Sequence, residues 1–460
     1  MATIRSIDPT TGAELAAFEE DTDEVVEQKL YAAAAAVDAL EAAGWDLRSD
    51  WMRATADLLD SETEQVAAMI TAEMGKPLAQ AKAEVAKSAY AMRFYADKAR
   101  DFLTGAELAD PSVVSASGAR TEFDPLGVVL AVMPWNFPIW QVVRFAAPAL
   151  MAGNVGILKH ASNVPQSALY LGELFTRGGF PEGAFSTLLI GSKRVEAVIR
   201  DPRVAAVTLT GSEGAGRSIA ATAGDVLKKA VLELGGSDPF IVMPSAKLDD
   251  AVEIAVKART SNNGQACINA KRFIVHTDIY DEFAEKFATR MAALTIGDPV
   301  EAGTEIGPLA TESGRRDIEE LVDDARDKGA DILTGGGRPA DTEGWFYQPT
   351  VIAGITDQMR LFAEEAFGPV ASLYRVDSLE AALEIANDSD FGLGSAFWST
   401  DQAEIDQAVR RIEAGAVFVN GMTISYPELP FGGIKHSGYG RELSAEGIRE
   451  FCNLKTVWVA

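Results

Sequence analysis

The strongest constraint on the fold is an alternation of short apolar runs with segments of helical periodicity, which begins at Pro125. Each apolar run has the length of a strand, and the segments between them repeat apolar residues at three- and four-residue spacing. The predicted strands are residues 127–133, 155–159, 184–190 and 204–209, and the intervening helices lie near 165–177 and 193–200. This alternation is typical of a parallel sheet covered by helices on both faces, so the predicted fold class is α/β.

A second region of the same kind follows and predicts a second α/β unit, which would carry Cys267. Its predicted strands are residues 239–243, 272–276, 370–374, 394–398 and 416–419, with helices near 248–259, 379–387 and 401–412. At 460 residues the chain also exceeds the size at which one hydrophobic core keeps growing. Two or three domains are therefore expected.

The segments that flank these units carry no chemical motif. Residues 8–18 predict a turn and a short strand, and residues 22–100 predict helices with a break at 75–77. Residues 107–124 predict a hairpin, and a hairpin that projects from the body would suit an oligomer contact. The C-terminal residues 453–459 predict an edge strand that could pair with another subunit.

The charge balance excludes two classes of partner. The chain has 41 basic and 68 acidic residues, a net charge of −27 and a pI near 4.5. Such a surface repels nucleic acid and anionic membranes, so neither is expected as a partner. The acidity is spread along the chain, as in a solvating surface, and a salt-rich environment is one explanation for it. The most apolar stretch, residues 142–158, contains Arg144, Pro148 and Asn154, which predicts a core segment rather than a membrane span.

The cysteine and histidine content indicates which cellular compartment to expect and whether a metal site is present. The two cysteines, Cys267 and Cys452, are too few for a disulfide framework, and the N-terminus has no apolar secretory segment. A reducing compartment, the cytoplasm, is therefore expected. The three histidines lie far apart in sequence without ligand spacing, so no metal site is expected.

Cys267 is the strongest candidate for a nucleophile, because the small and polar residues 262–266 before it would let a substrate carbon approach closely. Upstream, Glu233 precedes Leu234 and the paired glycines 235–236, which leave the backbone free to move. A carboxylate that can swing in this way is a candidate general base. The alternative interpretation is a buried structural cysteine and an ordinary turn at a strand end.

Other candidate residues follow predicted strands, at the sheet edge where open α/β sheets bind ligands. The segment 210–216 would let a dinucleotide pyrophosphate approach a helix N-terminus, although it is not the usual G-x-G-x-x-G pattern and Ser212 could be a plain helix cap. Asn136, after Trp135 and between two prolines, could donate to a developing oxyanion or form an Asx turn. Lys159 and Glu365 could contact a cofactor or simply be solvated.

Taken together, these segments resemble the NAD(P)-dependent aldehyde dehydrogenase superfamily over essentially the whole chain. The matching blocks are residues 134–138 (PWNFP), Lys159, 211–216 (GSEGAG), 233–236 (ELGG), 264–267 (GQAC), 365–369 (EAFGP) and 430–442 (PFGGIKHSGYGRE). The resemblance implies a Rossmann-type coenzyme domain (1–106 and 126–235), a catalytic domain (236–449) and an oligomerisation element (107–125 and 450–460). It also implies homodimers or homotetramers.

The resemblance further implies a role for each matched residue. Cys267 would attack the aldehyde carbon, and Asn136 with the Cys267 backbone N–H would hold the oxyanion. Glu233 would activate the water that hydrolyses the thioester, and Glu442 matches the family's second glutamate near the end of the active-site channel. The residues expected to bind the cofactor are Trp135, Lys159, Ser162, Gly211, Ser212, Gly216, Leu234, Glu365 and Phe367.

Ser162 indicates which of the two nicotinamide cofactors the protein should prefer. Many NAD-preferring members carry a glutamate at this position, where it bonds the adenosine ribose hydroxyls. A serine removes the carboxylate that would repel a 2′-phosphate and adds a hydrogen-bond donor. We therefore expect NADP rather than NAD as the preferred cofactor.

The segments 138–141 and 159–165 resemble bacterial or archaeal succinate-semialdehyde dehydrogenases. Arg144 and Ser425 match residues that hold the substrate carboxylate there, but Ser261 stands where better-known members carry an arginine. Arg144 could instead tie its helix down, so oxidation of a broader range of aliphatic or aromatic aldehydes stays open. A coenzyme-A-acylating enzyme is disfavoured by Glu233, which a thiol acceptor would not need. A non-catalytic member is disfavoured by the presence of both Cys267 and Glu233.

Overall fold

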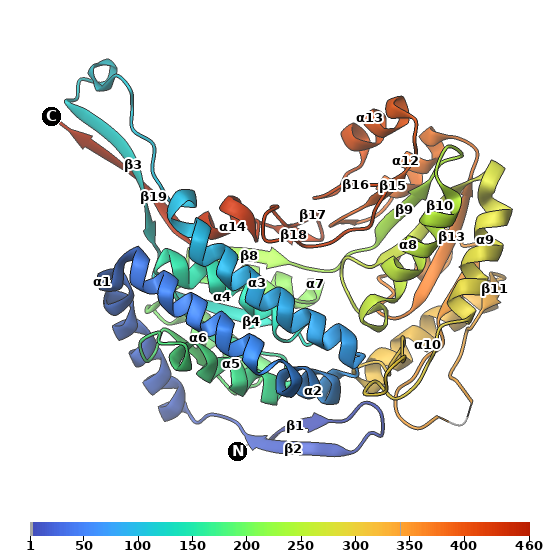
Figure 1. The fold of residues 1–460 in the computed structure, drawn as a ribbon, viewed down its shortest axis with the longest axis horizontal. Helices are drawn as coiled ribbons and strands as arrows, with labels where there is room; N and C mark the ends of the chain where they lie inside the picture. The colour runs from blue at the N-terminus through green and yellow to red at the C-terminus, as the bar shows by residue number, and fades with distance from the viewer. Residues whose placement is uncertain (1–2, 341) are drawn as a thin grey trace.

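Two sheets organise the molecule (Figure 1). The first is built from residues 128–233 with one added strand from residues 438–439, and the second from residues 238–419. The structure is a computed structural model that describes residues 3–340 and 342–460. In this part of the chain no helix combines the length and the apolar character needed to cross a membrane. The predicted α/β class is confirmed.

The first sheet has the strand order β18-β8-β7-β4-β5-β6. All neighbours are parallel except β18, which runs antiparallel to β8. Its strands are β4 (Val128–Met133), β5 (Val155–His160), β6 (Phe185–Thr187), β7 (Val204–Thr210), β8 (Lys229–Glu233) and β18 (Gly438–Tyr439). Four of these were predicted, and β6 is shorter than the predicted 184–190. Lys159 was expected to end its strand and is the last residue but one of β5.

The topology of this sheet places a ligand site beside β4. From β4 the chain proceeds outward through β5 and β6, and then returns to the other side of β4 to form β7 and β8. The connections therefore diverge at the carboxyl ends of β4 and β7. In open α/β sheets this switch point is where ligands bind.

Helices cover the first sheet, and a separate two-stranded sheet of β1 (Thr3–Ile7) and β2 (Glu14–Glu19) packs against two of them (Figure 1). The predicted break at 75–77 is confirmed, since Gly75 ends one helix at a left-handed φ of 74° and Pro77 precedes the next. The helices are α1 (Asp23–Ser61), α2 (Thr63–Met74), α3 (Leu78–Phe102), α4 (Trp140–Ala152), α5 (Pro165–Arg177), α6 (Val195–Arg200) and α7 (Glu213–Asp225).

Helix α4 occupies most of the stretch that was predicted only as a core segment. All of its side chains are buried, including Arg144. Its first backbone N–H groups lack a local cap and are satisfied by Glu84 of α3, which accepts from Ile139 (2.9 Å) and Trp140 (3.0 Å). A carboxylate at this end also opposes the positive end of the helix dipole. Glu84 in turn pairs with buried Lys76.

The second sheet has the order β11-β12-β13-β10-β9-β15-β16, parallel except for β11. Its predicted strands and the helices over them are confirmed to within about two residues. The strands are β9 (Asp238–Val242), β10 (Ala270–His276), β11 (Asp331–Thr334), β12 (Thr350–Ala353), β13 (Val370–Val376), β15 (Ala396–Trp398) and β16 (Phe418–Val419). The helices are α8 (Leu248–Thr260), α9 (Thr277–Ala292), α10 (Glu312–Asp327), α11 (Arg360–Ala363), α12 (Leu379–Asn387) and α13 (Gln402–Arg411).

The two sheets meet end to end. The chain passes from the carboxyl end of β8 through residues 234–237 directly into the amino end of β9 (Figure 1). Cys267 lies just before β10, and Glu365 lies before β13, which pairs with β10. The amino end of the second sheet therefore faces the carboxyl end of the first, and the candidate residues gather between them.

A two-stranded arm projects from the first half of the molecule (Figure 1). It consists of β3 (Gly118–Pro125) and β19 (Cys452–Val459), which pair antiparallel over their full length. The predicted hairpin at 107–124 is corrected in part, because Glu107 and Arg120 form only an isolated bridge. The predicted C-terminal edge strand exists, but its partner is β3 of the same chain.

Candidate active site

The loop before Cys267 has an unusual backbone that side-chain amides hold in place. Asn262, Asn263 and Gly264 all adopt left-handed φ values, between 56° and 76°. The amide of Asn262 donates to the carbonyl of Asn136 (2.8 Å), and that of Asn263 donates to the carbonyl of Gly75 (2.8 Å). Because Asn tolerates this region better than most residues, the two asparagines keep the turn at low cost.

Gly264 faces the segment that carries Glu365. A Cβ atom at this position would collide with the backbone of Gly368. Arg259, fully buried, ties the same two segments together: it donates to the carbonyls of Gly264 (2.5 Å) and Ala366 (3.5 Å). The nucleophile loop and the Glu365 segment are thus fixed to each other.

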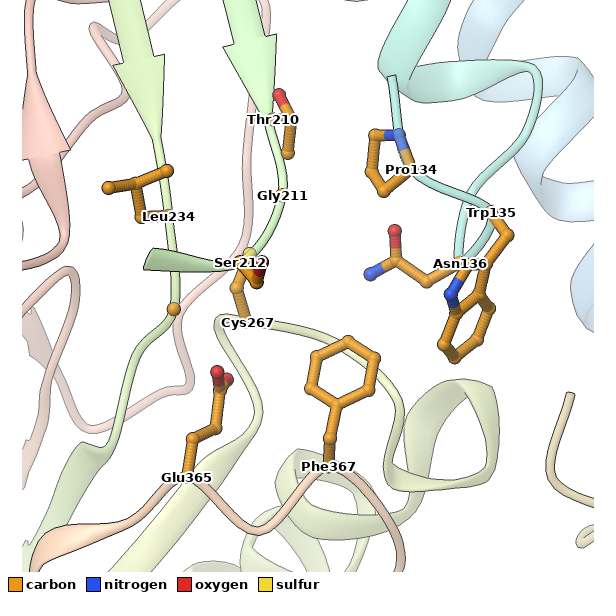
Figure 2. Close-up of a pocket in the computed structure, with 11 residues that line it drawn as sticks. Pro134, Trp135, Asn136, Thr210, Gly211, Ser212, Leu234, Cys267, Glu365 and Phe367 are labelled. Atoms are coloured by element: carbon orange, nitrogen blue, oxygen red, sulfur yellow. The ribbon is translucent and has the colours of Figure 1, made fainter. Parts of the chain in front are cut away.

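Cys267 lies between two cavities and lines both of them. The first cavity, of about 270 Å³, opens at the carboxyl ends of β4 and β7 (Figure 2). It is lined by Pro134, Trp135, Asn136, Thr210, Gly211, Ser212, Leu234, Gly235, Cys267, Glu365 and Phe367. The second, of about 220 Å³, is bounded by α3, α4 and residues 422–425. One thiol can therefore meet ligands from two sides.

Burial controls the ionisation of the thiol. Desolvation, with the nearby carboxylates of Glu365 and Glu233, raises the pKa of Cys267 to about 12. Lys271 and Arg144 act against this shift without cancelling it. The resting thiol is therefore protonated at neutral pH, and a base must take its proton before it can attack a carbon.

Asn136 points its amide toward the nucleophile loop (Figure 2). Its side chain is buried, and its Nδ2 donates to the carbonyl of Gln265 at 3.0 Å. The same carbonyl accepts from Asn262, also through Nδ2, at 3.1 Å. One N–H of Asn136 is thus used to fix the amide, and the second is available to a ligand oxygen.

Glu233 ends strand β8 and is 1% exposed. Neither of its carboxylate oxygens has a hydrogen-bond partner in the described part of the chain. Burial, and to a lesser extent the Glu442 carboxylate, raise the pKa of Glu233 well above its ordinary value. The segment after Glu233 lies against the nucleophile, because a Cβ on Gly236 would stand 2.7 Å from the Cys267 carbonyl oxygen. A raised pKa makes the Glu233 carboxylate a stronger base than an exposed glutamate.

Arg144 and Glu442 form a buried ion pair behind Cys267. Arg144 also donates to the Thr210 hydroxyl (3.3 Å) and lies 4.7 Å from the centre of the Phe431 ring. Burial raises the pKa of Glu442 and the Arg144 guanidinium lowers it. Arg144 reaches the second cavity, but its charge is balanced by Glu442 from the other side.

Residues predicted to bind a cofactor fall into two groups. Trp135, Gly211, Ser212, Leu234, Glu365 and Phe367 line the first cavity, where the rings of Trp135 and Phe367 meet edge to face at 5.6 Å (Figure 2). Gly216 lies beneath Leu234, since a Cβ there would stand 2.6 Å from the leucine side chain. Lys159 and Ser162 are outside the cavity lining, the first half-buried with a pKa lowered by desolvation and the second exposed.

The structure also shows a residue that sequence reasoning missed. Lys87, on α3, lines the second cavity and donates from Nζ to the Ser425 hydroxyl at 2.8 Å. Its Nζ lies 4.2 Å from the centre of the Trp140 ring. In the sequence Lys87 belongs to a long helical region without a motif, so nothing in the pattern distinguishes it from other helical lysines.

Comparison with known proteins gives a consistent result. The model of the aldehyde dehydrogenase family matches residues 1–457. The succinate-semialdehyde dehydrogenase (NADP+) of Mycobacterium avium is 60% identical over 457 residues, which cover 99% of this chain and 96% of that protein. A Mycobacterium tuberculosis protein of the same name is 58% identical, with 99% of this chain and 100% of that one covered.

Solved structures show the same likeness in three dimensions. The succinic semialdehyde dehydrogenase of Streptococcus pyogenes, crystallised with NADP+, superposes with a TM-score of 0.96 at 38% identity, covering 99% of both chains. The succinate-semialdehyde dehydrogenase of Burkholderia pseudomallei gives a TM-score of 0.96 at 36% identity, covering all of this chain and 95% of the other.

Proposed function

This chain belongs to the aldehyde dehydrogenase family, and we propose that it oxidises succinic semialdehyde to succinate with NADP+. It is an oxidoreductase that acts on aldehydes with a nicotinamide cofactor. The observation that carries the proposal is the position of Cys267 between two cavities. One cavity is suited to a nucleotide, and the other is lined by the cations Lys87 and Arg144. Relatives at about 60% identity that bear this name support the choice of substrate.

The first cavity fits a nicotinamide nucleotide. Helix α7, of 13 residues, begins at its edge with Ser212 as cap, so its N-terminal N–H groups favour a pyrophosphate. Trp135 and Phe367 provide aromatic walls, and the Glu365 carboxylate is placed to accept from a ribose hydroxyl. When bound, the oxidised nicotinamide accepts the hydride of the aldehyde. Exposed Ser162 would tolerate a 2′-phosphate, which supports NADP over NAD.

In the first step the Cys267 sulfur forms a bond to the aldehyde carbon. The second N–H of the Asn136 amide and the backbone N–H of Cys267 donate to the oxygen that becomes negative. The thiol proton passes to solvent as the sulfur–carbon bond forms. Loss of hydride from the same carbon leaves a thioester on Cys267.

Hydrolysis completes the cycle. Glu233 takes a proton from water, the water oxygen adds to the thioester carbon, and the carbon–sulfur bond breaks to release the acid. In sum, aldehyde, NADP+ and water give carboxylate, NADPH and two protons. Glu442 adjusts the charge near Glu233 and keeps Arg144 in place, so we assign it a supporting role.

We further propose that the enzyme works in the cytoplasm as a homodimer or homotetramer. Both cysteines are free thiols, and a catalytic thiol must stay reduced. The arm exposes Leu454 (58%) and Trp458 (51%), and a nearby turn exposes Val113 (70%). Apolar side chains gathered on a projecting arm are typical of a surface that another subunit covers.

The direct test is kcat/KM for succinic semialdehyde and for butyraldehyde, which lacks the distal carboxylate, each with NADP+ and NAD+. We expect a clear preference for the semialdehyde and for NADP+, and no turnover by Cys267→Ala. Equal values for the two aldehydes would reject succinic semialdehyde as the specific substrate and leave a general aldehyde dehydrogenase. A preference for NAD+ would reject the role given to Ser162.

A further inference from the structure

The second cavity has an unbalanced charge. Its described lining includes two cations, Lys87 and Arg144, and no carboxylate. The remaining walls are apolar or uncharged, with Phe137, Trp140 and Phe431 among them. A cavity of this kind suits a short aliphatic chain that carries one negative charge at its end.

The two cations are not equivalent. Arg144 is paired with Glu442, donates to Thr210 and lies over the Phe431 ring, so its charge is neutralised and its position fixed. Carboxylates near Lys87 are engaged elsewhere, since Glu84 pairs with Lys76 and accepts from the start of α4. The charge that the cavity offers to a ligand therefore comes mainly from Lys87.

The contacts of Lys87 leave it able to hold a carboxylate. Its ammonium has three donors, one of which goes to the Ser425 hydroxyl at 2.8 Å. The Ser425 oxygen accepts there, so its own hydrogen is left to donate. The ammonium and the hydroxyl thus offer donors side by side, on a cavity that ends at Cys267. The Trp140 ring, 4.2 Å from Nζ, helps to keep the cation in place.

We propose that Lys87, with Ser425, is the specificity-determining carboxylate clamp of this enzyme, and that it substitutes for the cation absent at Ser261. Ser261 lines the same cavity, so a positive charge is delivered to the same space from helix α3 instead of from the nucleophile loop. The substrate class is a short aldehyde with a carboxylate at the opposite end. The inference rests on the proposed function, because it explains how the distal carboxylate would be recognised.

The test is the ratio of kcat/KM for succinic semialdehyde to that for butyraldehyde in three lysine variants. In Lys87→Met we expect the ratio to fall by about 10- to 100-fold, the range for loss of a hydrogen bond to a charged group. Lys87→Arg, which keeps the charge, should recover part of the ratio. Lys98→Met removes an exposed lysine of the same helix and should leave the ratio unchanged.

A second measurement does not depend on turnover. Succinate should inhibit the wild-type protein competitively against the aldehyde and raise its Tm, and both effects should weaken in Lys87→Met but not in Lys98→Met. If Lys87→Met fails to fold, as judged by circular dichroism, Lys87→Gln and Ser425→Ala provide the same comparison with smaller changes.

The outcomes separate the two proposals. A wild-type ratio near one would reject the proposed substrate itself. A high wild-type ratio that Lys87→Met retains would reject Lys87 as the clamp and leave the proposed substrate standing. A high ratio that falls only in the Lys87 variants supports both.

Discussion

At the residue scale, the site is defined by ionisable groups that share one desolvated region. Burial raises the pKa of Cys267 to about 12, so the thiol is protonated in the resting protein, and burial also raises the pKa of Glu233 well above its usual value. Arg144 opposes each shift, but Glu442 balances most of its charge. The proposed attack by Cys267 therefore starts from a thiol rather than from a preformed thiolate.

Replacing Glu233 separates the two halves of the reaction. In Glu233→Gln the amide cannot accept the proton of the attacking water, so thioester hydrolysis should slow by about 10²- to 10⁴-fold. We expect stopped-flow absorbance to show a burst of NADPH equal to the active sites, followed by slow turnover. Glu196→Gln, exposed in the first turn of α6, is the control without a proton-transfer role. Loss of the burst as well as the turnover would place Glu233 in the first half-reaction too.

The preference for succinic semialdehyde over butyraldehyde should depend on pH, because it depends on the charge of Lys87. Burial and the neighbouring charges of Arg144 and Lys76, partly offset by Glu84, lower the pKa of Lys87 to about 7. Above this pH the ammonium loses its proton, so the kcat/KM ratio of succinic semialdehyde to butyraldehyde should fall as pH rises from 6 to 9. Taking the ratio removes the effect of Cys267 ionisation, because both substrates react with the same thiol. A ratio that stays constant, or one that falls equally in Lys87→Arg, would contradict this assignment.

Sequence alone singled out candidate residues that lie in motifs and missed Lys87, which lies in none. Cys267, Asn136 and Glu233 lie in short segments with a distinctive composition, and the structure brings these segments together. Lys87 is found only because α3 packs beside α4 and turns one lysine toward Ser425. The pairing of Arg144 with Glu442 likewise depends on a contact between distant segments.

At the element scale, the nucleophile loop depends on a close approach between two backbones. Gly264→Ala should lower both Tm and activity, because Ala resists a φ of 76° and its Cβ would collide with Gly368. Gly12→Ala is the matched control: its φ is 74°, and a Cβ there meets no atom within 4 Å. We expect Gly12→Ala to cost about 1–2 kcal/mol and Gly264→Ala clearly more. Equal losses in chemical denaturation would show that the collision is relieved by small shifts.

The stability of helix α4 should depend on Glu84, which caps its N-terminus from helix α3. Glu84→Gln leaves buried Lys76 without its counter-charge and should cost about 3–5 kcal/mol, with reduced activity because α4 carries Arg144. Glu73 is the control, since it caps α5 in the same way by accepting from Gln166 (2.8 Å) and Ser167 (3.0 Å), away from the site. Glu73→Gln should lower stability and leave kcat/KM unchanged. Equal effects of both variants on kcat/KM would contradict a specific role for α4.

Elements were predictable where periodicity was clear. The ends of α5 and α12 agree with the sequence pattern, because one face of each is polar. Helix α4 could not be predicted in this way, because it is buried on every side and shows no amphipathic period, and Pro148 lies within it. The strand β8 was also missed, since it has only five residues and the first of them is exposed.

At the scale of the whole molecule, assembly should depend on the arm. Leu454→Asp places a charge on the exposed face of β19, so we expect the variant to have a smaller molar mass in solution than the wild type. Val409→Asp makes the same change at an exposed position of α13, away from the arm, and should assemble normally. Light scattering after size-exclusion chromatography measures the mass. Unchanged assembly of both variants would reject the arm as the contact.

The arm pairs two strands that the ribosome makes at very different times. Strand β3 is made long before its partner β19, because residues 126–451 lie between them. Until β19 has been made, β3 is therefore an open edge, which can template pairing with other chains. Here the charges on its side chains, Arg120, Glu122 and Asp124, would discourage such pairing until release. A nascent chain can thus pair β4 to β8 of the first sheet early, but closure of the arm, and any assembly that needs it, must wait until β19 has been made.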